Sequence, residues 1–190
     1  IFDVARQYFD FHLPESQVFV ADGRHYLNKN KTAYDLVVLD AFNSDMVAWH
    51  LLSREALLTA GKSLSDGGMV AINFTSLTES DDVAGLFATL VSVFDHVRLF
   101  EKKHESGLSS FIFLSSYLPM DLSIEETILT GGKLKTVEIF FEGEVEQLAV
   151  ADIYTDDYNP VAYQRREVQL QWRKEMRDHF SDSQSLLLYN

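Results

Sequence analysis

Three apolar runs in the first half of the chain have the length and composition of β-strands. They cover residues 17–21, 34–39 and 67–74, and the last is entered through a Gly-Gly turn. The runs lack a regular alternation of apolar and polar positions, which favours strands buried on both faces of a sheet. Helix-length segments separate them, so the pattern predicts parallel βαβ units in an α/β domain.

Helical spacing of apolar residues marks the segments around these strands. Apolar positions within residues 1–9 predict an opening helix, and residues 24–28 a short one. Ser53 is expected to cap a helix over residues 54–64. Acidic residues 81–82 are expected to begin a further helix, because negative charge is favourable at a helix N-terminus. The apolar face of that helix is expected to hold Val83, Leu86, Phe87, Leu90, Val91 and Phe94.

The remaining segments complete the expected architecture. Residues 97–100 and 111–115 predict a closing antiparallel pair, and residues 118–153 are only weakly helical in pattern. Residues 154–160 form a dense turn segment, in which Asn159 is expected to cap a final helix that begins at Pro160. The apolar stripe of that helix is expected to hold Val168, Trp172, Met176 and Phe180.

Composition restricts the class of protein. The chain has 190 residues, 46% of them hydrophobic and 24% charged, which is ordinary for a globular domain. Its apolar runs are too short to cross a bilayer, so we expect no membrane partner, and the absence of cysteine is compatible with the cytoplasm. The net charge of −13 disfavours nucleic acid as a partner, since phosphate binding needs clustered Lys and Arg. A solvated acidic surface explains this charge without any ligand.

Two acids stand at the ends of neighbouring expected strands. Asp22 follows the first strand and precedes Gly23, and Asp40 follows the second. Ligands of open α/β sheets bind outside the carboxyl ends of the strands, so a ligand is expected at these acids. Asp22 could accept a hydrogen bond from an amine or a ribose hydroxyl, or it could simply cap a helix. Asp40 precedes a polar loop and could hold a cationic amine or take a proton from one.

Other kinds of site find little support in the sequence. The six histidines never approach metal-ligand spacing, and an adjacent acid pair such as Asp156-Asp157 is more often a turn feature than a cation site, so no metal is expected. The sequence has no nucleophile-elbow motif and no phosphate-cradling glycine loop.

Taken together, these segments resemble the spermidine synthase (polyamine aminopropyltransferase) superfamily, whose fold is similar to that of class I methyltransferases. The resemblance is strongest over residues 1–116. The segments that carry it are Val4-Ala5-Arg6-Gln7-Tyr8-Phe9, Val20-Ala21-Asp22-Gly23-Arg24, Tyr34-Asp35-Leu36-Val37-Val38-Leu39-Asp40-Ala41-Phe42, Leu64-Ser65-Asp66-Gly67-Gly68 and Thr155-Asp156-Asp157-Tyr158-Asn159-Pro160.

The resemblance implies a Rossmann-like, methyltransferase-type sheet, mostly parallel with an antiparallel closing strand, whose first strands are absent from this chain. Residues 1–116 would be the C-terminal part of the nucleoside-binding domain, and residues 117–190 a helical extension of it. The opening at Ile1 in mid-helix agrees with the expectation that residues have been removed upstream. The chain by itself is then expected to be inactive.

The implied reaction transfers an aminopropyl group from decarboxylated S-adenosylmethionine to a polyamine. By resemblance, Asp22 contacts the adenine amine, Asp40 orients and deprotonates the attacking amine, and the loop from Ala41 to His50 gates the site. Gly23 and Ala41 are also expected at the cofactor. The residues expected at the polyamine are Asn43, Asp45 and Tyr158.

One position departs from the family pattern and keeps two alternatives open. Family enzymes usually carry a second acid three residues after the first, where this chain has Asn43. An amide can hydrogen-bond an amine but cannot neutralise its charge. The alternatives are an S-adenosylmethionine-dependent methyltransferase of small molecules and a non-catalytic relative that acts as an interaction module. The resemblance also makes a homodimer plausible.

Overall fold

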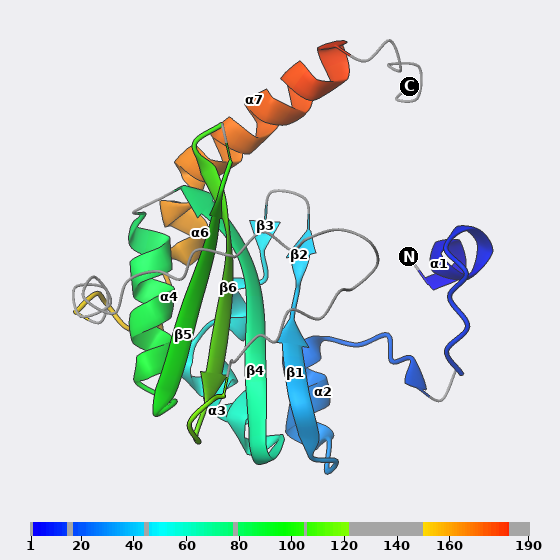
Figure 1. The fold of residues 1–190 in the computed structure, drawn as a ribbon, viewed down its shortest axis with the longest axis vertical. Helices are drawn as coiled ribbons and strands as arrows, with labels where there is room; N and C mark the ends of the chain where they lie inside the picture. The colour runs from blue at the N-terminus through cyan, green and yellow to red at the C-terminus, as the bar shows by residue number, and fades with distance from the viewer. Residues whose placement is uncertain are drawn as a thin grey trace.

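The computed structural model describes residues 2–14, 17–43, 46–77, 80–104, 106–121 and 150–182. Their largest element is a four-stranded sheet in the order β1-β4-β6-β5 (Figure 1). Its strands are β1 (Tyr34–Leu39), β4 (Leu64–Leu77), β5 (His96–Lys103) and β6 (Leu108–Ser116). β1 and β4 are parallel, whereas β6 is antiparallel to both β4 and β5. The predicted α/β class and the antiparallel closing pair are therefore confirmed, in a sheet that is mixed.

The strand expected at residues 17–21 does not form. Among the described residues β1 pairs only with β4 and is therefore an edge strand, and residues 17–21 have no strand beside them. An isolated β-favouring segment gains no ladder hydrogen bonds and buries little apolar surface, so sequence preference alone does not make it a strand. Val20 is accordingly 94% exposed.

Helices cover one face of the sheet. These are α3 (Arg54–Lys62) and α4 (Asp81–Val91), while α2 (Gly23–Lys29) packs against α3 (Figure 1). The predicted cap of α3 is confirmed, because the Ser53 hydroxyl oxygen accepts a hydrogen bond from the Ala56 N–H at 3.2 Å. The opening helix α1 (Phe2–Tyr8) is also confirmed, and it stands apart from the sheet (Figure 1).

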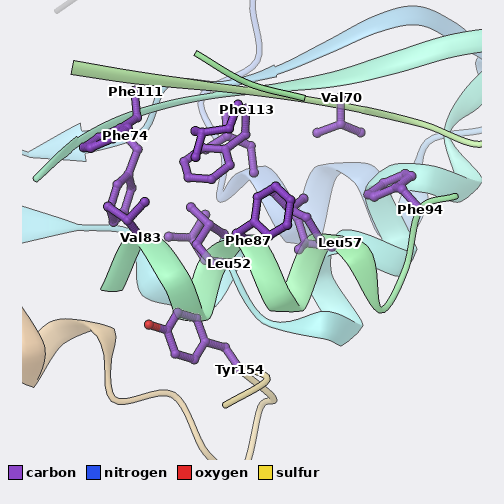
Figure 2. Close-up of a cluster of buried hydrophobic side chains, with 14 of the residues drawn as sticks. Leu52, Leu57, Val70, Phe74, Val83, Phe87, Phe94, Phe111, Phe113 and Tyr154 are labelled. Carbon is purple, nitrogen blue, oxygen red and sulfur yellow. The ribbon is translucent and has the colours of Figure 1, made fainter. Parts of the chain in front are cut away.

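The hydrophobic core lies between the sheet and these two helices. Figure 2 shows side chains of β4 and β6 pointing from the strands towards α3 and α4. Phe74 and Phe113 meet edge to face, with ring centroids 6.2 Å apart. The opposite face is more open: Leu36 and Val38 of β1 are 49% and 57% exposed. Burial on both faces was therefore a wrong prediction for β1, since the described helices cover only one of them.

The predicted apolar face of α4 is mostly correct. Val83, Leu86, Phe87 and Leu90 are buried, as is Phe94 just beyond the helix, but Val91 is 44% exposed. Tyr154 lies on the far side of α4 from the sheet (Figure 2), with its side chain fully buried. This burial raises the pKa of the Tyr154 phenol. A Cβ atom at Gly85 would stand 2.2 Å from the Tyr154 hydroxyl, so α4 requires glycine there.

The C-terminal part of the chain ends in two helices, α6 (Val161–Gln164) and α7 (Arg166–Asp182). The expected helix start at Pro160 with Asn159 as its cap is wrong by one residue, because Pro160 occupies the N-cap position of α6. The Asn159 side-chain oxygen accepts a hydrogen bond from the Val161 N–H at 3.3 Å. α7 extends beyond the end of the sheet (Figure 1). Of its predicted stripe Val168 is buried, Trp172 half-buried and Met176 36% exposed, while the Phe180 side chain lies outside the described residues.

A buried ion pair joins this C-terminal part to the core. Arg165 Nη1 donates to Asp82 Oδ2 at 3.2 Å, and the two side chains are 5% and 1% exposed. The Ser76 hydroxyl also hydrogen-bonds the Asp82 carboxylate, and the Arg165 guanidinium lies 4.7 Å from the centre of the Phe74 ring. Desolvation lowers the pKa of Arg165, although Asp82 opposes the shift. The division expected at residue 116 remains a prediction, and most of the weakly helical segment 118–153 lies outside the described residues.

Candidate functional site

The carboxyl ends of β1 and β4 meet at one edge of the sheet because these strands are parallel. Asp40 follows β1 directly, and Leu39 pairs with Ile72 in the register of the two strands. The Asn73 side-chain amide donates a hydrogen bond to Asp40 Oδ1 at 3.0 Å. This hydrogen bond orients the carboxylate. Because Asp40 is exposed, the carboxylate is also accessible to a ligand that carries an N–H.

A small, partly open pocket lies beside this acid, with a cavity volume of about 10 Å³, room for about one water molecule. That volume is far below the roughly 300–1,000 Å³ of typical small-molecule sites, so a nucleoside does not fit inside it. Its walls are mainly aliphatic, with Asn73 as the polar residue and Phe74 as the aromatic one. The lining residues are Leu39, Ala41, Ala48, Leu51, Leu52, Ile72, Asn73 and Phe74.

Asp22 is the N-cap of α2, which is the structural alternative that the sequence left open. Its Oδ1 accepts a hydrogen bond from the His25 N–H at 2.9 Å. Its Oδ2 accepts another from His50 Nε2 at 2.7 Å. The His25 N–H, followed by the His50 side chain, lowers the pKa of Asp22. Asp22 is therefore an anionic acceptor at the surface, with a side chain 49% exposed.

Gly23 is the first residue of α2. A Cβ atom there would lie 3.8 Å from the Leu51 methyl groups, an ordinary contact. Space alone thus does not require glycine at position 23. Its expected place at the cofactor remains a prediction.

The loop after Asp40 contains local structure that the sequence analysis did not predict. β2 (Phe42–Asn43) and β3 (Met46–Val47) form a two-stranded ribbon, in which Asn43 pairs with Met46. The Ala48 N–H donates to the Ala41 carbonyl at 3.2 Å and closes the loop. A 3₁₀ helix, η2 (Trp49–Leu51), follows. Of the residues predicted here, Ala41 lies at the pocket wall, and Asp45 lies outside the described residues.

The turn segment at residues 154–160 is attached to the same region from the far end of the chain. Arg24 donates two hydrogen bonds to the Asp156 carboxylate, Nη1–Oδ1 at 2.7 Å and Nη2–Oδ2 at 2.6 Å. The Ser53 hydroxyl donates to Asp156 Oδ1 at 2.6 Å. Arg24, with a smaller effect of Ser53, lowers the pKa of Asp156, and Asp156 in turn raises the pKa of Arg24. A bidentate pair of this kind fixes geometry as well as charge.

Sequence reasoning missed this pairing. Arg24 follows Asp22-Gly23 directly in sequence, and the acid pair at residues 156–157 predicts only a turn. Because 132 residues separate Arg24 from Asp156, no local spacing relates them. The acidic pair within a dense turn was a sequence signal for a polar contact, but it did not indicate Arg24 as the partner.

Tyr158 is placed in that turn and is 52% exposed. Its hydroxyl donates to Asp152 Oδ2 at 3.3 Å, and the negative charge of Asp152 raises the pKa of the phenol. The neighbouring Asn159 side-chain amide donates to the Trp49 carbonyl at 2.9 Å. The structure thus brings the turn to η2, but the Tyr158 hydroxyl bonds Asp152 while Asp40 is bonded by Asn73.

The described part of the chain lacks two further features. It contains no group of three or more His, Asp or Glu side chains arranged to hold a metal ion. No helix within the same residues has the length and apolar character needed to span a membrane.

Comparison with known proteins gives relatives of one kind. The polyamine aminopropyltransferase of Vibrio vulnificus is 29% identical over 127 residues, which are 65% of this chain and 42% of that protein. Polyamine aminopropyltransferase 2 of Pseudomonas aeruginosa is 34% identical over 110 residues, 55% of this chain and 31% of that protein. The chain therefore spans less than half the length of either relative. No family model matches the sequence.

Solved structures agree on the fold. A probable spermidine synthase from Corynebacterium glutamicum has a TM-score of 0.65 at 20% identity, covering 81% of this chain and 59% of that one. A spermidine synthase in complex with the transition state analogue AdoDATO has a TM-score of 0.54 at 18% identity, with coverages of 78% and 54%. Human methyltransferase-like protein 13, in complex with SAH, has a TM-score of 0.50 at 16% identity, with coverages of 87% and 66%. Together, the named relatives and the methyltransferase-like fold support a spermidine synthase-like superfamily for this chain.

Proposed function

We propose that this protein transfers an aminopropyl group from decarboxylated S-adenosylmethionine to a polyamine acceptor such as putrescine. The observation that carries the proposal is the Asp40 carboxylate, which Asn73 orients at the carboxyl edge of the parallel pair β1–β4. Relatives named polyamine aminopropyltransferases and a spermidine synthase fold support the same reaction class. The proposed place of action is the cytoplasm, with no nucleic acid or membrane as partner.

The chemistry is a nucleophilic displacement. The lone pair of the acceptor amine forms a new N–C bond, the C–S bond of the sulfonium breaks, and its electron pair stays on sulfur as methylthioadenosine. The amine is a nucleophile only when neutral, and Asp40 would orient it and take the proton that it releases. In-line placement of amine and sulfonium supplies much of the remaining rate enhancement. No metal takes part in this scheme.

The other residue roles are proposed on the same basis. Asp22 would accept a hydrogen bond from the adenine amine, with Gly23 and Ala41 beside the nucleoside. Asn43, Asp45 and Tyr158 would contact the polyamine. An S-adenosylmethionine-related ligand is proposed because structures of this fold bind AdoDATO or SAH.

The test is a product analysis. The full-length natural protein is incubated with decarboxylated S-adenosylmethionine or S-adenosylmethionine and a panel of polyamines, and the products are identified by mass spectrometry. An aminopropylated amine with released methylthioadenosine is the expected result. A methylated product would replace the proposal with a methyltransferase, and no turnover with either donor would favour a non-catalytic relative.

A further inference from the structure

The two carboxylate oxygens of Asp22 have different partners. Oδ1 accepts the His25 N–H and thereby caps α2. Oδ2 accepts a hydrogen bond from the His50 imidazole at 2.7 Å. Because a carboxylate oxygen only accepts, the His50 nitrogen at this distance carries the proton. The oxygen that is not committed to the helix is therefore the one that His50 contacts.

His50 is brought to Asp22 by a loop that is anchored on both sides. Leu51 and Leu52 are 7% and 3% exposed and hold the loop against the core. The Asn159 side-chain amide, from the turn segment 154–160, donates to the Trp49 carbonyl at 2.9 Å. The His50 side chain itself is 39% exposed, so it lies at the surface while the backbone next to it is held.

We propose that His50 competes with the adenine amine for Asp22 Oδ2, so that the nucleoside displaces His50 when it binds. The inference rests on the proposed function, because it assigns Asp22 as the acceptor of the adenine amine. An N–H of the exocyclic amine and the His50 N–H would approach the same oxygen at hydrogen-bond distance. Because both side chains of this pair are at the surface, the competition weakens binding without abolishing it.

The size of the effect follows from the exposure of the pair. Hydrogen-bonded pairs between exposed polar side chains contribute little free energy. Because the nucleoside must break the His50–Asp22 hydrogen bond in order to bind, its affinity is reduced by about two- to fivefold. Removing the His50 side chain should therefore tighten nucleoside binding by that factor. A residue that merely shaped the site would weaken binding when truncated.

The experiment measures the Kd of 5′-methylthioadenosine by calorimetry for the wild type and three variants. His50→Ala is expected to bind about two- to fivefold more tightly. His50→Gln keeps an N–H donor near Asp22 and is expected to bind like the wild type. His25→Ala is the matched control, because His25 contacts Asp22 through its backbone N–H and its exposed side chain is dispensable for the cap. An unchanged or weaker affinity of His50→Ala would overturn the inference.

A second ligand and a second variant separate this inference from the proposed function. The analogue of methylthioadenosine with purine in place of adenine lacks the amine, so His50→Ala should leave its Kd unchanged. Asp22→Ala should weaken methylthioadenosine binding, and in that background His50→Ala should have no further effect. If Asp22→Ala weakens binding but His50→Ala does not tighten it, only the competition is wrong. If Asp22→Ala binds like the wild type, or no variant binds, the proposed role of Asp22 and the competition fail together.

Discussion

The buried pair of Arg165 and Asp82 gives the sharpest test of how the C-terminal helices are held. We consider Arg165→Met, which removes the guanidinium but keeps an apolar side chain over Phe74. The carboxylate of Asp82 is 1% exposed and would lose the Arg165 Nη1 contact at 3.2 Å. Breaking one partner of a buried pair lowers the free energy of unfolding by about 3–5 kcal/mol, because the remaining charge is left without its counter-ion.

For a chain of 190 residues this loss corresponds to a fall in melting temperature of about 6–20 °C. Thermal unfolding followed by circular dichroism measures it. The matched control is Arg166→Met, an exposed neighbour for which a change within about 0.5 kcal/mol is expected. The double variant Asp82→Asn with Arg165→Met should recover part of the loss, since no buried charge remains. If Arg165→Met melts within about 2 °C of Arg166→Met, the pair does not hold the helices and the reasoning is wrong.

Three further predictions follow from the site and the core. Asp40→Asn should lower kcat by about a hundredfold with the thermal stability kept, measured as product formation; a change under about threefold would exclude a general-base role. The pKa of Asp156 is lowered by Arg24, so its stabilising contribution is complete above pH about 4 and fades as the pH falls through the lower folded-state value. Denaturant titrations between pH 2.5 and 7 should thus show that wild type has a higher free energy of unfolding than Asp156→Asn. The difference should be under about 1 kcal/mol at neutral pH, because the pair is part-exposed, and should vanish in acid. A difference independent of pH would contradict this. Gly85→Ala should lower the free energy of unfolding by about 1–3 kcal/mol, because the new methyl group would overlap Tyr154, and wild-type stability in a urea titration would refute that close approach.

The elements that the sequence predicted best are those whose signals are local. Residues 34–39 form β1 with the predicted bounds, and Ser53 caps α3 as its position before the apolar pattern indicated. Residues 17–21 have an equally good strand composition but do not form a strand. Strand formation depends on a neighbour elsewhere in the chain, and five residues of sequence carry no information about that neighbour.

The candidate site was likewise predicted only in part. Asp22 and Asp40 were found because they follow apolar runs, but their partners were not. His50 lies 28 residues from Asp22, and Asn73 lies 33 residues from Asp40. Such contacts arise only when the sheet and the loops are assembled, so the sequence indicated the acids without the side chains that orient them.

The bidentate ion pair of Arg24 and Asp156 has a consequence for the order of folding. Contacts between residues 132 positions apart require a large loop to close, and long-range contacts of this kind slow folding. A nascent chain that ends before Asp156 could already pair β1 with β4, yet Arg24 and Ser53 would lack the carboxylate that joins them. The region around Asp22 would then reach its final geometry only at the last stage of folding, after the sheet on which it rests.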